Sequence, residues 1–267
     1  MKVIKKTLVA GVLACSALNA QAEVDALSYG IKAAYSASYL SANQGAKFKG
    51  DKEMSAKLLG NQFIAGSLYV EYAFNDYIGL GLEAGYMKQG GVLKEKAAEN
   101  KATTTSPETS SASTDTATKV KEDSIEITTN GIIVPLSLYV YPLGREEGEG
   151  IFKLAFGLSA YVPVGDPDLK QIKNGTDAQI DVSKVLADTD KKKQLPGFDF
   201  AIHAGMAWEF PVGLSMEARG SFGLMNRFDL EKDKTQTVFD DITDLKVLKN
   251  NYFSFSLGYN LATLFCD

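Results

Sequence analysis

Few side chains of this 267-residue sequence belong to the types that perform catalysis or bind metals. His203 is the only histidine, and the two cysteines are Cys15 and Cys266. One histidine excludes a multi-histidine metal site and disfavours a Ser-His-Asp triad, and two cysteines exclude a cysteine-based zinc site. Acidic residues such as Asp166 and Asp240 match no calcium-loop spacing. We therefore expect no catalytic, cofactor-binding or metal-binding residues.

Four charged residues are more informative, because they interrupt segments that are otherwise apolar or small. Lys32, Glu71, Glu83 and Arg219 lie on the small-residue side of four alternating segments. Counted from the end that adjoins a short connection, all four lie at a similar depth. An unpaired charge is costly to bury, so we predict a paired charge layer at this depth. Four further charged residues are expected to extend the network near the same rim: Lys153, Asp199, Glu209 and Glu217.

These residues belong to eight segments in which apolar side chains alternate with polar or small ones, as in strands with two different faces. Residues 124–129 are expected to extend the fourth segment, and a change of phase at Asn130 and Gly131 indicates a bulge. The eight predicted strands cover residues 28–40, 63–74, 78–87, 132–141, 151–164, 198–210, 214–224 and 252–265.

The connections between the segments alternate strictly between short and long. The short ones are 75–77, 142–150 and 211–213, and the long ones are 41–62, 88–123, 165–197 and 226–251. This pattern is typical of an up-and-down transmembrane β-barrel with short periplasmic turns and long external loops. The loop at about 88–123 is rich in Ser and Thr, which bury little apolar area, so we predict disorder there. A hairpin at 238–248 could raise the count from eight strands to ten.

One face of these strands is bulky and apolar, and the other is rich in Gly, Ala and Ser. An eight-stranded barrel has little internal volume, so the bulky face should point outward, toward lipid. Tyr29, Leu82, Phe156 and Trp208 are therefore expected on the outside. The alternative is a secreted soluble barrel that carries lipid, whose apolar face would point inward. The outward aromatic residues form two predicted belts, at the short-turn end (Tyr29, Phe74, Phe152, Trp208, Phe210 and Phe265) and at the loop end (Tyr39, Tyr86, Phe198, Phe200 and Phe253).

The first 22 residues have the features of a secretory signal peptide. Three lysines precede a short apolar run, and Ala20-Gln21-Ala22 forms an A-x-A cleavage site, so the mature domain would comprise residues 23–267. The whole chain carries a net charge of −5, and without these lysines the mature chain has 25 basic against 33 acidic residues, or −8. This balance argues against a nucleic-acid partner.

Three stretches resemble the small outer-membrane β-barrel proteins of the PorT-like and OmpA- or OmpX-like kind. Residues 133–142 (IVPLSLYVYP) resemble the fourth strand of that family, and residues 198–205 (FDFAIHAG) with 213–219 (GLSMEAR) resemble its glycine-containing hairpin. Residues 256–261 (SLGYNL) are similar to the last-strand signal that the barrel insertion machinery reads. The chain departs from the family by ending in Cys266-Asp267 rather than in an aromatic residue.

The resemblance implies an all-β barrel in the outer membrane of a Gram-negative cell, but it implies no single activity. The barrel is expected to be a monomer surrounded by outer-membrane lipid and lipopolysaccharide, with no cofactor. We predict a structural or surface-interaction role, with a lumen plugged by paired charges. The alternatives are a narrow pore for small solutes and a lipid-modifying enzyme that uses His203 with a serine, although His203 is expected to face the lumen.

Overall fold

The computed structural model describes the barrel strands and parts of the connections. The described residues are 26–42, 47–48, 52–57, 63–95, 124–145, 149–165, 167–173, 176–179, 198–226, 242–243 and 247–264. The predicted signal peptide, most of the Ser/Thr-rich loop and Phe265 lie outside these ranges. Within them, no helix is both long and apolar enough to cross a membrane.

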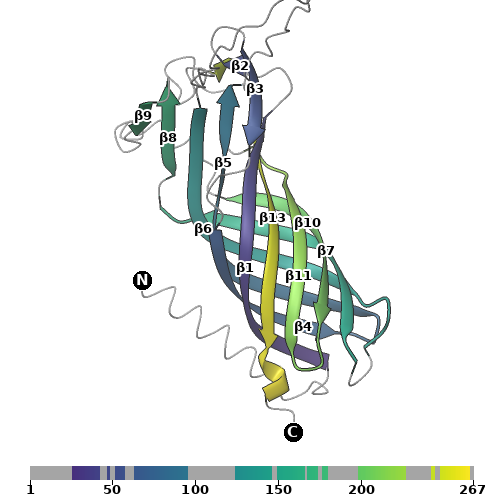
Figure 1. The fold of residues 1–267 in the computed structure, drawn as a ribbon. Helices are drawn as coiled ribbons and strands as arrows, with labels where there is room; N and C mark the ends of the chain where they lie inside the picture. Colours follow the sequence, from purple (N-terminus) through teal and green to yellow (C-terminus); the bar gives the residue numbers. More distant parts are fainter. Residues whose placement is uncertain are drawn as a thin grey trace, which may run out of the picture.

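Eight long antiparallel strands close into a ring, as predicted (Figure 1). Their order around the ring is β5-β4-β1-β13-β11-β10-β7-β6, and pairing between β5 and β6 completes it. Closure leaves no open edge, so the ring satisfies its own backbone hydrogen bonds in lipid. The strands are β1 (Leu27–Ala42), β4 (Phe63–Ala73), β5 (Ile78–Glu95), β6 (Ser124–Val140), β7 (Ile151–Pro163), β10 (Asp199–Glu209), β11 (Leu214–Gly223) and β13 (Leu248–Asn260).

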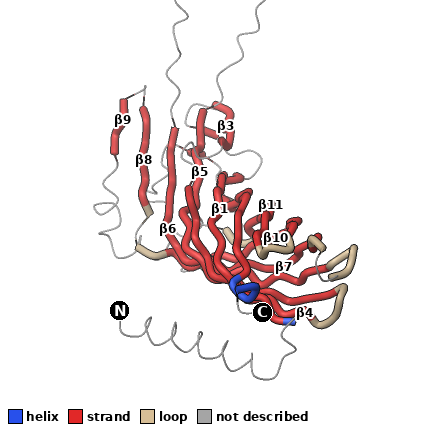
Figure 2. Tube along the Cα trace, turned by 60° about the horizontal axis from the view of Figure 1, so that its bottom comes forward, coloured by secondary structure: helices blue, strands red, loops and turns tan. Residues whose placement is uncertain are grey.

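Five short strands extend the barrel sheet at its long-loop end, and together with the upper parts of β5 and β6 they form what we call the external sheet. The upper part of β5 pairs with β3 (Lys52–Lys57), which pairs with β2 (Lys47–Phe48) and then β12 (Ile242–Thr243). On the other side, β6 pairs with β8 (Asp168–Lys173), which pairs with β9 (Thr176–Gln179). Figure 2 shows this sheet rising beyond the ring. Within 238–248 the structure describes residues 242–243, which form β12 of the external sheet, and 247–248, where β13 begins, so this described part adds no ninth strand to the barrel.

Strands β5 and β6 differ from their predictions. Strand β5 continues to Glu95, so Lys88 to Glu95 is strand where a loop was predicted. The predicted bulge at Asn130 and Gly131 is wrong, because β6 keeps one register with β5 from Lys94↔Ser124 to Ile78↔Val140. The change of phase arises because the apolar residues change faces, not because the strand is interrupted. On the loop side of Gly131, the apolar residues Ile125 and Ile127 are on the inward face, where they are buried.

The predicted last strand ends early, at Asn260, and a 3-10 helix, η3 (Leu261–Leu264), follows. The Asn260 side chain favours this change, because its Oδ1 accepts a hydrogen bond from the Ala262 amide at 3.0 Å. The Asn260 carbonyl also accepts a hydrogen bond from Thr263 Oγ1 at 2.7 Å. Two of the short turns have similarly local causes. Asn75 Oδ1 accepts the amides of Tyr77 and Ile78, and Gly213 has a φ of 80°.

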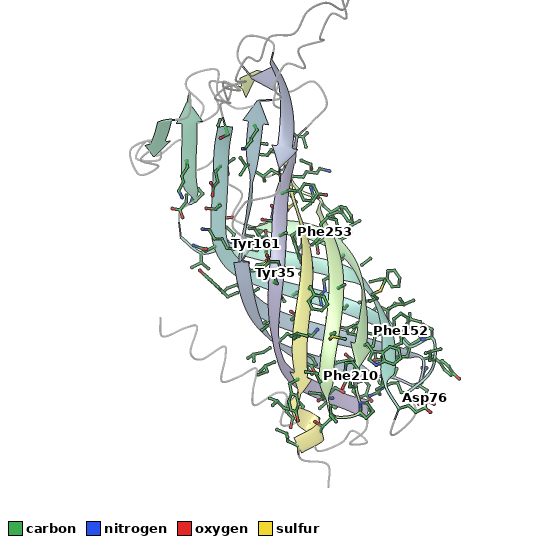
Figure 3. The ribbon with its side chains drawn as sticks, viewed as in Figure 1. Tyr35, Asp76, Phe152, Tyr161, Phe210 and Phe253 are labelled. Carbon is green, nitrogen blue, oxygen red and sulfur yellow. The ribbon has the colours of Figure 1, made fainter. Side chains whose placement is uncertain are left out.

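The predicted sidedness is confirmed. Leu82, Phe156 and Trp208 are exposed and Tyr29 is half-buried, whereas the opposite face is buried. Within the predicted belts, Phe152 packs against Trp208 at one end, and Tyr39 stacks on Phe253 at the other. In Figure 3, Phe152 and Phe210 lie near the end that carries Asp76, and Phe253 lies farther up.

Candidate functional site in the barrel lumen

The lumen is crossed near its middle by four charged side chains, here called the central charge cluster: Lys32, Glu83, Glu217 and Arg219. Lys32 Nζ lies 2.7 Å from Glu217 Oε2 and 3.4 Å from Glu83 Oε2. Arg219 donates from Nε to Glu217 Oε1 at 2.6 Å and from Nη2 to Glu83 Oε2 at 3.0 Å. Strands β5 and β11 are on opposite sides of the ring, so the Arg219–Glu83 pair bridges the lumen.

A second group, the inner charge cluster of Glu71, Lys153 and Glu209, lies nearer the short turns. Lys153 Nζ donates to both carboxylate oxygens of Glu71, at 2.8 and 2.9 Å, and lies 2.6 Å from Glu209 Oε2. Glu71 also accepts a hydrogen bond from the Tyr141 hydroxyl at 2.8 Å, and Glu209 from Asn260 Nδ2 at 2.8 Å. Glu71 and Glu209 are on opposite strands of the ring, so this cluster also crosses the lumen.

The structure groups the predicted charges differently from the sequence analysis. Lys32, Glu83 and Arg219 come together, but the register pairs Glu71 with Ser28 rather than with Lys32, so Glu71 belongs to the inner cluster. Glu217 joins the central cluster, and Lys153 and Glu209 join the inner one. Asp199 is not at the short-turn rim, because β10 begins at Asp199 at the loop end. For Glu71 the cause is strand stagger, which a closed barrel requires and a count along each strand ignores. Asp199 was instead assigned to the wrong end of its strand.

Uncharged residues that the sequence analysis did not single out complete both clusters. Ser67 Oγ donates to Glu83 Oε1 at 2.6 Å, and Tyr69 lies 4.8 Å from Lys32 Nζ in a cation–π arrangement. Tyr141 and Asn260 satisfy the glutamates of the inner cluster. The sequence did place these residues on the inward face of their strands. Ser and Tyr are too common in strands, however, for an inward position alone to identify them as partners of the buried charges.

His203 lies in the lumen, as predicted, and is buried. Its Nε2 lies 2.9 Å from Ser137 Oγ, and its Nδ1 lies 2.8 Å from Ser159 Oγ. Gly157 makes room for the imidazole, since a Cβ there would lie 2.8 Å from Nε2. Both ring nitrogens are thus occupied by hydroxyl groups on the two adjacent strands β6 and β7, and the ring is turned away from lipid. The arrangement fixes the imidazole against this wall of the lumen.

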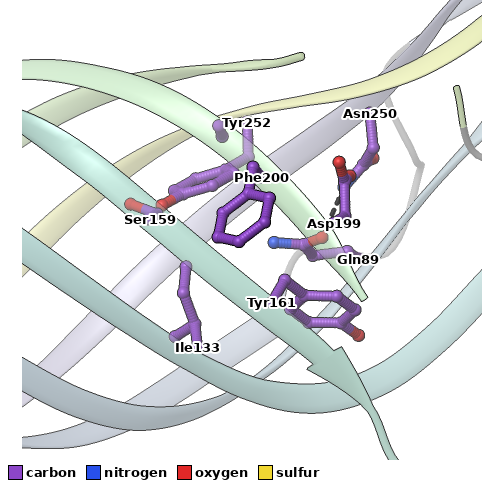
Figure 4. Close-up of a pocket in the computed structure, with 9 residues that line it drawn as sticks. Gln89, Ile133, Ser159, Tyr161, Asp199, Phe200, Asn250 and Tyr252 are labelled. Carbon is purple, nitrogen blue, oxygen red and sulfur yellow. Dashed lines mark hydrogen bonds between the residues drawn. The ribbon is translucent and has the colours of Figure 1, made fainter. Parts of the chain in front are cut away.

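A small cavity lies above His203, between Gln89, Asp199, Asn250 and Tyr252 (Figure 4). Asn250 Nδ2 donates to Gln89 Oε1 at 2.5 Å, which links β13 to β5 across the lumen. The space holds about one water molecule, which could satisfy the Asn250 Oδ1 atom, for which the structure shows no protein partner. No group of three metal-ligating side chains occurs among the described residues.

Beyond this cavity, the inward face of the barrel becomes apolar. We call this region the outer apolar cluster. Leu93 pairs with Ile125 across β5 and β6, and Gly91 lies against Leu40, where a Cβ would come within 2.9 Å of Leu40 Cγ. The residues of this cluster are among the most completely buried of the described chain: Leu40, Leu93, Ile125, Ile127 and Leu248.

These features define a class of protein: a closed eight-stranded transmembrane barrel with a lipid-facing apolar exterior and paired charges in its lumen. A family described as outer membrane protein beta-barrel domain matches residues 19–229, most of the sequence. The chain belongs to this family, and it is a protein of the Gram-negative outer membrane.

Comparison with solved structures finds small outer-membrane barrels. Ail of Yersinia pestis is 13% identical over 88% of this chain and 98% of its own, with a TM-score of 0.36. Neisserial surface protein A is 9% identical over 87% of this chain and 97% of its own, with a TM-score of 0.32. The N-terminal barrel domain of Pseudomonas aeruginosa OprF is 10% identical over 87% and 97%, with a TM-score of 0.31. No curated protein matches the sequence.

Proposed function

We propose that this protein is a closed, non-catalytic barrel that holds its external sheet and loops at the cell surface, in a structural or surface-interaction role. The observation that carries the proposal is the Arg219–Glu83 contact of 3.0 Å, which joins opposite walls in the middle of the lumen. Buried charges with several partners are fixed in place, because breaking one pair leaves an uncompensated charge. Such a bridge obstructs the passage of solutes.

Two further layers support a closed lumen. The inner charge cluster crosses it below the central cluster. The buried side chains of the outer apolar cluster lie at the end that faces the outside. A pore would need all of these layers to move aside, whereas a support for surface structures gains rigidity from each of them.

The external sheet supports a surface role. Strands β5 and β6 continue well past the ring, and five short strands are added to their edges. A barrel with no role outside the membrane would not need this extension. The external sheet and its loops would bind a partner outside the cell. Lipopolysaccharide, which surrounds the barrel in the outer membrane, is the nearest candidate.

Conductance tests the proposal directly. The purified protein, reconstituted into a planar bilayer, is expected to give no large, stable single-channel conductance, because both charge clusters bridge the lumen. Heat-dependent gel mobility of the same preparation shows that the barrel is folded. A large and stable conductance from the folded protein would contradict the closed-barrel proposal in favour of a pore. Lipid A altered in mass when cells express the protein would instead favour an enzyme.

A further inference from the structure

The most exposed large hydrophobic side chains of the described chain gather at the short-turn end. Val212 is 68% exposed, Leu143 67%, Tyr77 62%, Phe74 59% and Leu264 58%, and every other large hydrophobic residue described is less exposed. Exposed apolar groups that cluster in this way mark a surface that meets lipid or another molecule. This end of the barrel is therefore not a simple water-facing rim.

The turns do not need these apolar side chains for their shape. Asn75 sets the β4–β5 turn through its side-chain oxygen, and Gly144 and Gly213, both with positive φ, set the other two. Leu143 and Val212 each precede one of these glycines, Tyr77 lies two residues after Asn75, and all three side chains are exposed. Polar residues would serve the turns equally well, so the apolar side chains indicate a contact surface.

The depth of the barrel in the bilayer identifies the partner. On β7 the outward apolar run from Phe152 to Val162 covers ten residue steps, or about 26 Å along the membrane normal for strands tilted by about 40°. That run accounts for the hydrocarbon layer. Val212 lies four residues beyond Trp208, so it reaches roughly 5–10 Å past the belt, the depth of a headgroup layer.

The rim is also continuous with the lipid-facing surface. Phe74, a residue of the predicted belt, packs edge to face on the exposed Tyr72 of β4, with ring centroids 5.5 Å apart. We propose that Tyr77, Leu143, Val212 and Leu264 form a membrane-interaction surface that lies in the phospholipid headgroup layer of the periplasmic leaflet. This surface fixes how deep the barrel is seated, and so fixes the height of the external sheet above the membrane.

Tryptophan fluorescence can test this proposal, because Trp208 is the only tryptophan. The variant Trp208→Phe with Val212→Trp would be reconstituted into phosphatidylcholine vesicles whose acyl chains carry bromine near the headgroup. We expect strong quenching by the brominated lipid, and acrylamide quenching several-fold weaker than for N-acetyltryptophanamide in water. The unaltered protein, with Trp208 in the belt, provides the reference for a residue at the edge of the hydrocarbon layer.

A second variant, Trp208→Phe with Leu143→Trp, tests the same surface on another turn and covers the case in which the first does not fold. Heat-dependent gel mobility shows which of the two is folded. The proposal is overturned if the introduced tryptophan of a folded variant is quenched by acrylamide as in water and is unaffected by brominated lipid. The rim would then be a water-facing surface available to a periplasmic protein.

Discussion

Arg219 is buried in the lumen, where it makes ion pairs with two glutamates. Its guanidinium contacts Glu217 on its own strand and Glu83 on the opposite wall. The alternation of the sequence was sufficient to place Arg219, Lys32 and Glu83 inside the barrel. It was not sufficient to separate Glu71 from them, because the depth of a residue depends on the stagger between strands, which only the closed ring determines.

Replacing Arg219 by Ala should therefore destabilise the barrel strongly. Lys32 would be left as the only cation beside Glu83 and Glu217, at 3.4 and 2.7 Å. Removing one partner from a buried ion pair costs about 3–5 kcal/mol, and we expect a loss of that size in the free energy of unfolding, measured by urea titration in detergent micelles. The control is Lys170→Ala, an exposed residue of β8, which should change it by less than about 0.5 kcal/mol. A loss below about 1 kcal/mol for Arg219→Ala would show that the cluster does not hold the walls together.

Among the elements, the strands β5 and β6 show why small residues occupy the inward face. The ring of Tyr139 lies over Gly81, and a Cβ at Gly81 would be 2.4 Å from Tyr139 Cε2. The Tyr141 hydroxyl lies over Gly79 in the same way. The abundance of inward glycine was visible in the sequence, but its pairing with particular tyrosines was not, since each ring lies over a residue of the neighbouring strand.

Gly81→Ala should accordingly destabilise the β5–β6 pair. The added methyl group must displace the buried ring of Tyr139, and such overpacking costs about 1–3 kcal/mol. Gly66→Ala is the matched control, because a Cβ at Gly66 meets nothing within 4 Å. It should leave the free energy of unfolding within about 0.5 kcal/mol of the original. Adding Tyr139→Leu to Gly81→Ala should make the loss smaller than the sum of the two single losses, and strict additivity would argue against the contact.

The ends of the elements were harder to predict than their cores. Strand β5 passes through Gly90 and Gly91 on its way to Glu95, and these glycines resembled the start of a loop. Strand β13 was predicted to reach 265, but the Asn260 side chain favours the 3-10 helix that follows. For β5, pairing with β6 and β3 outweighed the local residue types. For β13, a side-chain cap ended the strand.

At the scale of the whole molecule, the lumen carries an excess of negative charge. The inward faces of the described barrel strands contain five carboxylates, Glu71, Glu83, Asp199, Glu209 and Glu217, but only three cations, Lys32, Lys153 and Arg219. A narrow passage lined in this way favours cations over anions. Any leak through a loosened lumen should therefore select potassium over chloride.

The charge clusters and the outer apolar cluster lie in series, so conduction should require both to be opened. Arg219→Ala with Lys153→Ala removes one of the two cations that bridge the central cluster and the single cation of the inner one, yet leaves Leu40 and Leu93 buried at the outer end. Leu40→Ser with Leu93→Ser does the reverse. Each pair alone should stay near the conductance of the unaltered protein in a planar bilayer, because the intact barrier limits the flow. The four substitutions together should give a narrow, cation-selective conductance, provided that heat-dependent gel mobility shows a folded barrel. Full conductance from either pair alone would mean that the other barrier does not seal the lumen.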